Sequence, residues 1–398
     1  MAITRRELLR TAGVVAGVAA IPANAATPAR PAAPSPPGTA ARGPTELFDV
    51  PDFERAAKGQ MSPMAWDYLT GAAADELTLR WNHEAYERLR LKPRVLIDVS
   101  KIDTRVQLLG RELPFPILLA PAAYHRLFHA EGELGVARGA GAINATMVVS
   151  TTATTTIEDI AAVATGPLWF QLYVQSDRGF TRELVRRAEA AGCQALVITV
   201  DTPVLGPRYR ELRGKFSLPP GIERANLKGL AAATGSHRPT EQSMYSAMLD
   251  PTVTWRDIDW LRSLTKLPVL LKGILNPDDA DRAAQAGVAG ILVSNHGARN
   301  LDTAPATIDA LPLVVAKVAG RVPVLVDGGI RRGTDILKAL ALGANAVLIG
   351  RPYLFGLAAQ GAPGVTRVVN ILRRELEMAM ALTGRTTIAS IDASVIWR

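Results

Sequence analysis

The chain has 398 residues, of which 48% are hydrophobic, and a formal net charge of +8. This apolar content can fill a large core and argues against a disordered chain. No block of lysines and arginines, aromatic-rich basic stripe or zinc-ligand spacing accompanies the positive charge, so we expect no nucleic-acid partner. The single cysteine, Cys193, excludes an intrachain disulfide and a cysteine metal site, and we predict no metal centre.

The first residues have the pattern of an export signal. Arg5 and Arg6 precede a weakly apolar stretch over residues 11–21, and the small residues Ala23-Asn24-Ala25 form a candidate cleavage site. Paired arginines before a mild apolar segment are typical of the twin-arginine route, which carries folded proteins. We therefore predict export to the periplasm or the extracellular space, and no integral membrane segment. The predicted organisation is a twin-arginine-type signal peptide over 1–25, a Pro/Ala-rich linker over 26–44 and one folded domain over 45–398.

Two helical segments, 53–58 and 63–69, are expected directly after the linker, and eight short apolar runs then follow. Short runs of β-branched and bulky apolar residues are typical of buried parallel strands. The predicted strands are Ile117–Ala120, Met147–Ser150, Trp169–Val174, Ala195–Asp201, Pro268–Gly273, Gly290–Asn295, Pro323–Asp327 and Ala346–Gly350. Helical patterns between or after them cover Thr181–Ala191, Trp255–Leu264, Asp278–Ala286, Thr334–Leu342 and Thr366–Leu382, and helix C-caps are expected at Gly192, Gly287, Gly343 and Gly384.

Eight strand–helix units in roughly 270 residues match the size of a (β/α)8 barrel. A doubly wound sheet is the alternative, but no glycine-rich dinucleotide turn follows the first strand. One connection, residues 206–253 after the fourth strand, is unusually long, which is typical of a lid or of a disordered segment. The predicted fold is therefore an α/β TIM barrel with an N-terminal helical extension and a long loop after strand 4.

Polar residues stand at the carboxyl ends of seven of the eight predicted strands, where barrel enzymes place their chemistry. An unpaired buried polar group costs about 2–7 kcal/mol, so this many polar groups in register indicate a functional site. The residues concerned are Ser150, Gln171, Tyr173, Thr199, Asp201, Lys272, Ser294, His296, Asp327 and Arg351.

The loops after the last two strands form a candidate phosphate site. Gly328, Gly329 and Gly350 allow the backbone to approach an anion closely, and Arg351 supplies a positive charge. Many barrel enzymes bind phosphate at this place, so the pattern by itself leaves the cofactor open.

The nonapeptide over residues 294–302, Ser-Asn-His-Gly-Ala-Arg-Asn-Leu-Asp, closely resembles the signature of FMN-dependent 2-hydroxy acid oxidases and dehydrogenases. The likeness spans roughly residue 45 to the C-terminus. The other matching segments are Tyr68 with Gly71 and Asp75, Ala120-Pro121, Gln171-Leu172-Tyr173, the run 199–203, Arg208, Lys272-Gly273, the run 327–333 and the run 349–352. This resemblance implies an FMN enzyme that oxidises a lactate-, glycolate- or mandelate-like L-2-hydroxy acid to the 2-oxo acid.

The resemblance also implies roles for individual residues at the substrate. His296 is expected to be the active-site base, and Asp201 to hydrogen-bond its imidazole and stabilise the imidazolium. Planar, bidentate donors suit a carboxylate, which fits Arg208 and Arg299 as the clamp for the substrate carboxylate. Two tyrosines complete the catalytic set: Tyr68 at the carboxylate, and Tyr173 at the hydroxyl or the developing carbonyl oxygen.

Further residues are expected, on the same resemblance, to hold the FMN. Lys272 is expected to face the N1/O2 edge of the flavin and to favour negative charge on the reduced ring. Ser294 is expected at the ribityl chain or the O2 edge, and Asp327 at the ribityl hydroxyls. The isoalloxazine contacts are expected from the backbone at Ala122 and Ala123 with Ser150, Gln171 and Thr199, and the phosphate contacts from Gly329, Arg331, Gly350 and Arg351.

The chain departs from the family pattern at three positions. Thr152 stands where some members carry a large aromatic residue, Asn300 where Gln is more usual, and Ala122 where a larger residue lies under the flavin. These changes leave the expected catalytic residues intact and affect which substrate fits, because a small residue at 152 can admit a longer substrate side chain.

Two other functions stay open from the sequence alone. One is another FMN- or phosphate-binding barrel enzyme, such as an isomerase, and the other is an exported flavin-binding barrel without catalysis. Cys193 lies on the amino-terminal side of a strand, which argues against a cysteine-dependent nucleotide dehydrogenase. The electron acceptor can be oxygen, a quinone or a cytochrome, and the resemblance implies a homo-oligomer, a tetramer.

Overall fold

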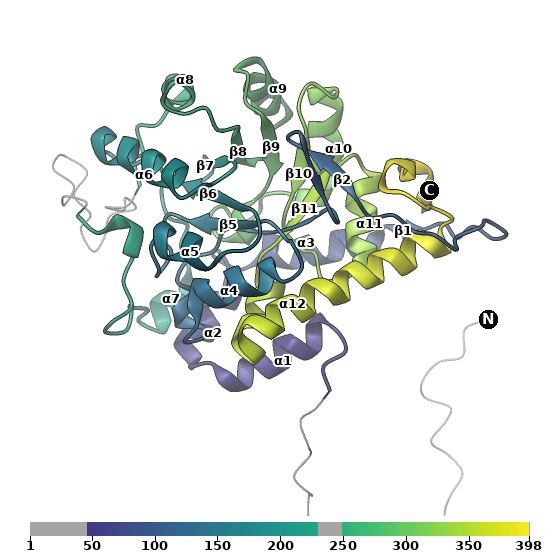
Figure 1. Ribbon diagram of the computed structural model, residues 1–398, viewed down its shortest axis with the longest axis horizontal. Coiled ribbons are helices and arrows are strands. Elements are labelled where there is room, and N and C mark those ends of the chain that lie inside the picture. Colours follow the sequence, from purple (N-terminus) through teal and green to yellow (C-terminus); the bar gives the residue numbers. More distant parts are fainter. Residues whose placement is uncertain (1–45, 230–248, 398) are drawn as a thin grey trace, which may run out of the picture. The chain divides into compact units, whose positions relative to one another are not determined.

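A closed barrel of eight parallel strands forms the core of the computed structural model (Figure 1). The structure describes residues 46–229 and 249–397, so the predicted signal peptide and linker lie outside the described residues. The barrel strands follow chain order, and β11 pairs with β4 to close the ring. They are β4 (Ile117–Leu119), β5 (Met147–Ser150), β6 (Leu168–Leu172), β7 (Leu196–Thr199), β8 (Val269–Ile274), β9 (Gly290–Val293), β10 (Val324–Val326) and β11 (Ala346–Ile349). The predicted barrel and all eight of its strands are confirmed.

Side chains along each strand alternate between the barrel interior and the layer of helices around it, as the two-residue period of a strand requires. In β4, Leu118 packs inside the barrel, whereas Ile117 and Leu119 belong to the outer core under the helices. Every residue of β4 is buried, because a parallel sheet is covered on both faces. The strands therefore read as continuous apolar runs in the sequence.

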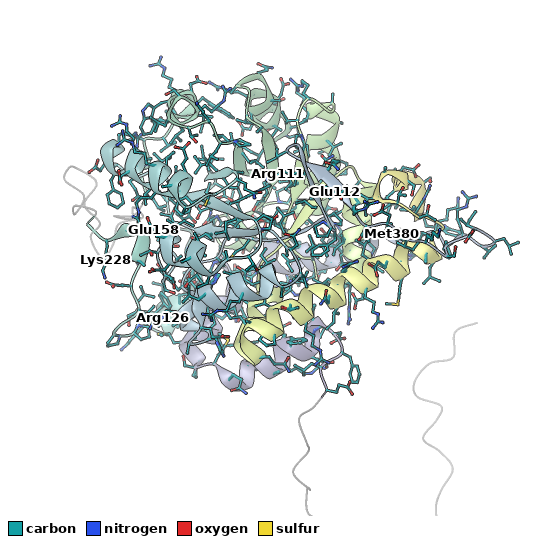
Figure 2. The ribbon with its side chains drawn as sticks, viewed as in Figure 1. Arg111, Glu112, Arg126, Glu158, Lys228 and Met380 are labelled. Atoms are coloured by element: carbon teal, nitrogen blue, oxygen red, sulfur yellow. The ribbon has the colours of Figure 1, made fainter. Side chains whose placement is uncertain are left out.

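A short hairpin closes the amino-terminal end of the barrel. Its strands, β2 (Val106–Leu108) and β3 (Arg111–Leu113), pair antiparallel just before β4. Leu108 and Leu113 pack into the inner core, while Arg111 and Glu112 stay exposed on β3 (Figure 2). This end of the barrel is thereby filled with apolar side chains, and the open end lies at the carboxyl ends of the strands.

Helices surround the barrel and bury its outer face. They are α4 (Gly132–Gly141), α5 (Ile157–Val163), α6 (Arg178–Ala190), α8 (Trp255–Leu264), α9 (Pro277–Gln285), α10 (Thr307–Val318), α11 (Gly333–Ala341) and α12 (Arg351–Leu382). The four glycines expected as C-caps all have positive φ, between 68° and 101°. Left-handed backbone at this position is what a glycine-terminated helix requires, so these helix ends were predictable.

The last helix, α12, begins fifteen residues before the predicted start at Thr366. Its first part is interrupted at Gly361, whose φ of 62° breaks the helical geometry. A Cβ on Gly356 would lie 2.5 Å from the carbonyl oxygen of Gly364, so the two halves pack closely across this kink. Glycines and a proline in this part weaken the helical pattern of the sequence, so the predicted helix began too late, at Thr366.

The N-terminal extension consists of α1 (Val50–Gln60), α2 (Pro63–Thr70) and α3 (Leu77–Arg88), of which α3 was not predicted. Asp49 and Ser62 cap α1 and α2 by accepting hydrogen bonds from backbone N–H groups of the first turn. A second small sheet forms where β1 (Arg90–Leu91), which follows α3, pairs antiparallel with β12 (Ile396–Trp397) near the C-terminus.

The long loop after β7 contains the short helix α7 (Tyr209–Arg213) and a 3-10 turn over Ala225–Leu227 in its described part, while residues 230–248 lie outside the described residues. Within residues 46–229 and 249–397, no helix is both long and apolar enough to cross a membrane.

Candidate active site

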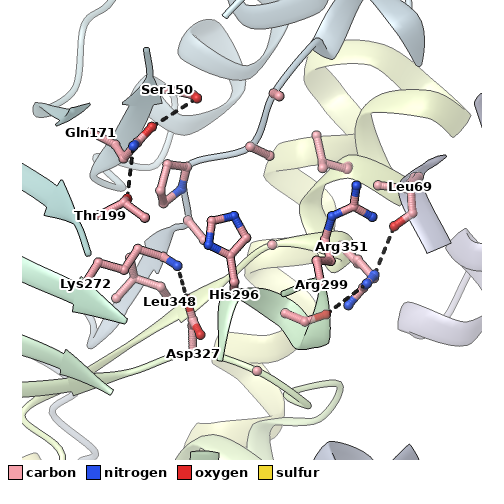
Figure 3. A pocket seen from close by; sticks show the side chains of 18 of the residues that line it. Leu69, Ser150, Gln171, Thr199, Lys272, His296, Arg299, Asp327, Leu348 and Arg351 are labelled. Atoms are coloured by element: carbon pink, nitrogen blue, oxygen red, sulfur yellow. Dashed lines mark hydrogen bonds and ion pairs between the residues drawn. The ribbon is translucent and has the colours of Figure 1, made fainter. Parts of the chain in front are cut away.

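The polar residues predicted from the strand ends meet in one pocket at the open end of the barrel (Figure 3). Parallel strands bring their carboxyl ends to the same rim, so residues far apart in sequence become neighbours. Of the predicted catalytic and cofactor residues, all but Asp201 and Ser294 line this pocket, and these two lie directly behind His296 and Lys272.

A chain of hydrogen bonds joins three neighbouring strands at the floor of the pocket. Ser150 Oγ donates to Gln171 Oε1 at 3.1 Å, and Gln171 Nε2 donates to Thr199 Oγ1 at 2.9 Å. All three side chains are buried, so the mutual bonds replace lost water contacts. They fix the orientation of the Gln171 amide at the surface on which a planar ring can lie.

His296 is presented to the pocket by a strained turn. His296, Gly297 and Ala298 have φ values of 59°, 62° and 66°, although two of them are not glycine. Such residues cost about 1–3 kcal/mol each unless surrounding contacts enforce them. Here the His296 amide donates to Ser294 Oγ at 3.1 Å, and the Ala298 carbonyl accepts from the Ala73 amide at 2.8 Å.

The two nitrogens of the His296 ring have different partners. Nδ1 lies 2.8 Å from Asp201 Oδ1, and Nε2 lies 3.2 Å from the Tyr173 hydroxyl. Burial lowers the pKa of His296, and Lys272 lowers it further, against the opposing effect of Asp201. Burial alone would raise the pKa of Asp201, but His296 and Lys272 outweigh it and the pKa is lowered. The pair is thus a neutral imidazole beside a carboxylate, which is the state of a general base.

Arg208 and Arg299 lie together at the mouth of the pocket with a carboxylate that was not predicted. Glu211, on α7, places Oε1 2.7 Å from Arg299 Nη2 and Oε2 3.7 Å from Arg208 Nη1. Arg299 also donates to the carbonyl of Tyr68 at 2.7 Å and covers the Tyr68 ring. Burial raises the pKa of Tyr68 to about 12, so its hydroxyl keeps its proton. Two guanidinium groups and one carboxylate leave a net positive charge that suits a single carboxylate ligand.

The last two loops fit a phosphate group. Gly329 has a φ of 79°, and a Cβ there would lie 2.1 Å from the Asn82 carbonyl oxygen, so only glycine fits. Burial lowers the pKa of Arg351 to about 9, and repulsion from Arg299 and Arg331 adds to this. An anion beside these guanidinium groups would relieve that repulsion.

Arg351 also connects this region to His296. Its guanidinium donates to the carbonyls of Leu69, Gly71 and Gly297 at 2.9, 2.9 and 3.1 Å. Figure 3 shows the contact with Leu69. Gly297 directly follows His296, so one arginine connects the end of α2 to the turn that carries His296.

Lys272 and Asp327 form the remaining polar wall. Lys272 Nζ donates to Ser294 Oγ at 2.9 Å and lies 3.4 Å from Asp327 Oδ2. The other oxygen, Asp327 Oδ1, is buried and has no hydrogen-bond partner among the described residues. An acceptor of this kind at a pocket wall fits a ligand hydroxyl. The phosphate loops, the acceptor for a polyol hydroxyl and the flat, hydrogen-bonded floor of the pocket together fit FMN.

Several residues around the pocket were not predicted from the sequence. Tyr124, Phe128 and Phe216 surround Tyr68, with the Phe216 ring stacked 4.5 Å from the Tyr68 ring. His83 on α3 lies near Arg331 and Arg351, and burial with these two charges lowers its pKa to about 4. All four come from loops or from the unpredicted helix, where no strand register indicates which side chains point inward. Among the described residues no cluster of His, Cys, Asp and Glu could hold a metal ion.

Comparisons with known proteins agree on the family to which the chain is similar. The FMN-dependent dehydrogenase family model matches residues 57–398. An L-lactate oxidase of Nostoc sp. is 49% identical over 365 residues, covering 90% of this chain and 99% of that protein. A peroxisomal (S)-2-hydroxy-acid oxidase of Oryza sativa subsp. japonica is 51% identical over 350 residues, covering 87% and 94%. A crystal structure of mandelate oxidase with (S)-2-phenylpropionate has a TM-score of 0.80 and 42% identity, covering 87% of this chain and 97% of that chain.

Proposed function

The chain belongs to the family of FMN-dependent 2-hydroxy acid oxidases and dehydrogenases, and from this premise we propose an exported oxidase that delivers electrons to oxygen. Its reaction is the FMN-dependent oxidation of an L-2-hydroxy acid to the 2-oxo acid. The observation that carries the catalytic assignment is the His296 ring, held by Asp201 at Nδ1 and open to the pocket beside Tyr173 at Nε2.

Each polar residue of the pocket has a separate role in the proposed reaction. Arg208 and Arg299 hold the substrate carboxylate, with the neutral Tyr68 hydroxyl beside them. His296 Nε2 takes up the proton that leaves the substrate, and Asp201 stabilises the imidazolium that results. When bound, FMN supplies the two-electron acceptor for this oxidation. Lys272 contributes a positive charge at the cofactor wall, and Tyr173 donates to the oxygen that becomes the carbonyl.

Anaerobic reduction of the flavin tests this function directly. The purified protein should be yellow, and an L-2-hydroxy acid should bleach the flavin absorption without oxygen. His296→Ala should retain FMN and lose about 10²–10⁴-fold in the rate of bleaching, because a positioned base contributes that much. Arg299→Lys should weaken substrate binding, since an ammonium lacks the planar fork. Bleaching of His296→Ala at the parental rate would remove the base assignment, and a protein that binds no FMN would remove the function.

Oxygen as the acceptor is supported by the similar proteins, whose names identify oxidases. Air admitted to the bleached enzyme should restore the yellow colour within the turnover time and release hydrogen peroxide. Slow reoxidation by air together with fast reoxidation by a quinone or an exported cytochrome would contradict this part of the proposal.

The substrate is expected to carry a side chain larger than that of glycolate. Thr152 is small and buried at the pocket wall, and the apolar Tyr124, Phe128 and Leu205 line the same pocket. Thr152→Phe should therefore lower kcat/KM for a bulky substrate such as mandelate while kcat/KM for glycolate falls less. Equal losses for both acids would show that position 152 does not border the substrate side chain.

Export of the folded, FMN-loaded enzyme is supported by the paired Arg5 and Arg6 and by the non-covalent hold expected for FMN. Changing both arginines to lysine keeps the charge and removes the recognised pair. The variant should accumulate inside the cell as an active, uncleaved precursor, whereas the parent should appear outside the cytoplasmic membrane with its N-terminus near Ala26. Export of the double-lysine variant at the parental level would contradict the twin-arginine route.

A homo-oligomer, a tetramer by resemblance, is the proposed assembly. The segment after β1 exposes Val95, Leu96 and Ile97 to solvent, and it packs beside Gly384 at the end of α12. Adjacent exposed apolar side chains of this kind are typical of a surface that another subunit covers. Light scattering should give the mass of an oligomer for the parent and a lower mass for Leu96→Lys.

A further inference from the structure

Two uncharged residues, Thr202 at the pocket wall and Asn300 behind it, form hydrogen bonds around Nδ1 of His296 and around Asp201. Thr202 Oγ1 lies 3.1 Å from His296 Nδ1 and donates to Asp201 Oδ1 at 2.9 Å. Asn300 Nδ2 donates to Thr202 Oγ1 at 2.7 Å and to the Asp201 carbonyl at 2.9 Å. Neither residue lies among the groups expected to touch FMN or the substrate carboxylate.

Only one placement of the protons satisfies the hydrogen bonds of this cluster. A threonine hydroxyl has one proton and two lone pairs. The proton is directed to Asp201, and the Asn300 amide occupies one lone pair, so the remaining lone pair faces His296 Nδ1. Asp201, as a carboxylate, is an acceptor only. Both groups that face Nδ1 therefore accept, and Nδ1 must carry the proton. In the neutral ring Nε2 is then the bare nitrogen, facing the Tyr173 hydroxyl.

Close backbone packing holds the two loops of this cluster together. A Cβ on Gly206 would lie 2.0 Å from the Asn300 carbonyl oxygen, and a Cβ on Gly273 would lie 2.4 Å from the Asp201 Cβ. The loop after β7 is therefore pressed against both the loop after β9 and the end of β8. Thr202 is only 6% exposed, so water has little access to replace its hydroxyl.

We propose that Thr202 and Asn300 are positioning residues for the base: they hold His296 in the tautomer whose unprotonated Nε2 faces the substrate, and they bind the loop after β7 to the turn after β9. This inference rests on the proposed function of His296. Thr202 completes the acceptor set at Nδ1, and Asn300 orients the Thr202 hydroxyl and anchors the Asp201 backbone.

Thr202→Val tests the proposal, because valine keeps the shape and removes the hydroxyl, and Thr202→Ser is the matched variant that retains it. Thr202→Val should slow anaerobic flavin reduction about 3- to 10-fold, the range of one neutral hydrogen bond. The substrate dissociation constant and the FMN content should stay at parental values, since the arginine clamp and the phosphate loops are untouched. Thr202→Ser should restore most of the rate. Equal rates in Thr202→Val and the parent would overturn the proposal, and so would equal losses in the valine and serine variants.

Nitrogen NMR of histidine-labelled protein gives a readout that packing damage alone would not produce. The His296 signals, assigned by their loss in His296→Gln, should show a protonated Nδ1 and a bare Nε2 in the parent. Thr202→Val and Asn300→Ala should each raise the share of the Nε2-protonated form. In the double variant the rate loss should be smaller than the product of the single losses, because Asn300 acts partly through Thr202. An unchanged tautomer in both single variants would refute the proposal, even if the parent fails to oxidise any 2-hydroxy acid and the proposed function falls.

Discussion

If His296 is the base, as proposed, its pKa determines how the rate of flavin reduction responds to acid. Burial and Lys272 lower the pKa of His296 below the ordinary histidine value of about 6.5. The imidazole therefore stays neutral, and able to accept a proton, as the pH falls below that value. We expect the acid limb of the rate of anaerobic flavin reduction to lie below pH 6.5 in the parent. Lys272→Met should move this limb to higher pH, since it removes a charge that disfavours the imidazolium. A limb that shifts the other way would show that Lys272 does not act on His296.

The only cysteine of the sequence does not line the pocket. Cys193 is buried at the amino-terminal side of β7, and burial raises the pKa of its thiol to about 12. A thiol in this state is a poor nucleophile. Iodoacetamide should label it only after unfolding, and Cys193→Ala should reduce its flavin at the parental rate. Rapid labelling of the native protein would contradict this burial.

Residues at strand ends could be predicted from the apolar runs, whereas loop residues such as Arg208 and Arg299 were predicted only from the resemblance to the family. His296, Asp201 and Lys272 stand directly after apolar runs, so their places in sequence determine their places on the rim. Glu211 and Thr202 lie in a loop after β7, where no periodicity tells which side chain turns inward. Their roles follow only from the distances in the folded chain.

Helix α3 shows why a local pattern is not enough to predict an element. Its sequence contains Trp81, Asn82 and His83, and its stabilising contacts are long-range: Asn82 exchanges amide hydrogen bonds with Asn295 at 2.9 and 3.1 Å. This amide pair joins α3 to the turn that carries His296. Propensity is a weak guide for such a helix, since tertiary packing supplies its stability.

The packing of α3 against the phosphate loop leads to a prediction for Gly329. Gly329→Ala should weaken FMN binding strongly and lower Tm, because the new Cβ would meet the Asn82 carbonyl 2.1 Å away. Gly320→Ala is the matched control: Gly320 also has positive φ, at 72°, but nothing lies within 4 Å of its Cβ position. The control should lose only about 1–2 kcal/mol from backbone strain and should keep its FMN. Similar FMN loss in both variants would contradict the close approach of α3.

The free energy of unfolding of the whole molecule should depend on histidines that the fold keeps neutral. Burial, with Arg331 and Arg351, lowers the pKa of His83 from 6.5 to about 4. Between these values the unfolded chain binds a proton that the native chain does not, so stability is full above about pH 6.5 and falls as the pH drops towards 4. Urea unfolding midpoints should decrease across this window, and the decrease should be smaller in His83→Gln. An identical slope in His83→Gln and the parent would contradict the role of His83.

Barrel closure has a consequence for how the enzyme is made. The ring is complete only when β11 pairs with β4, and the pocket takes Tyr68 from before β4 and Arg351 from after β11. Contacts between such distant segments form late, after the costly closure of long loops. A nascent chain on the ribosome therefore lacks a complete flavin pocket until its last quarter has been synthesised. FMN therefore binds the apoprotein after the chain has left the ribosome. The yield of loaded enzyme then depends on how fast FMN binds compared with how fast proteases degrade the apoprotein, and not on the rate of translation.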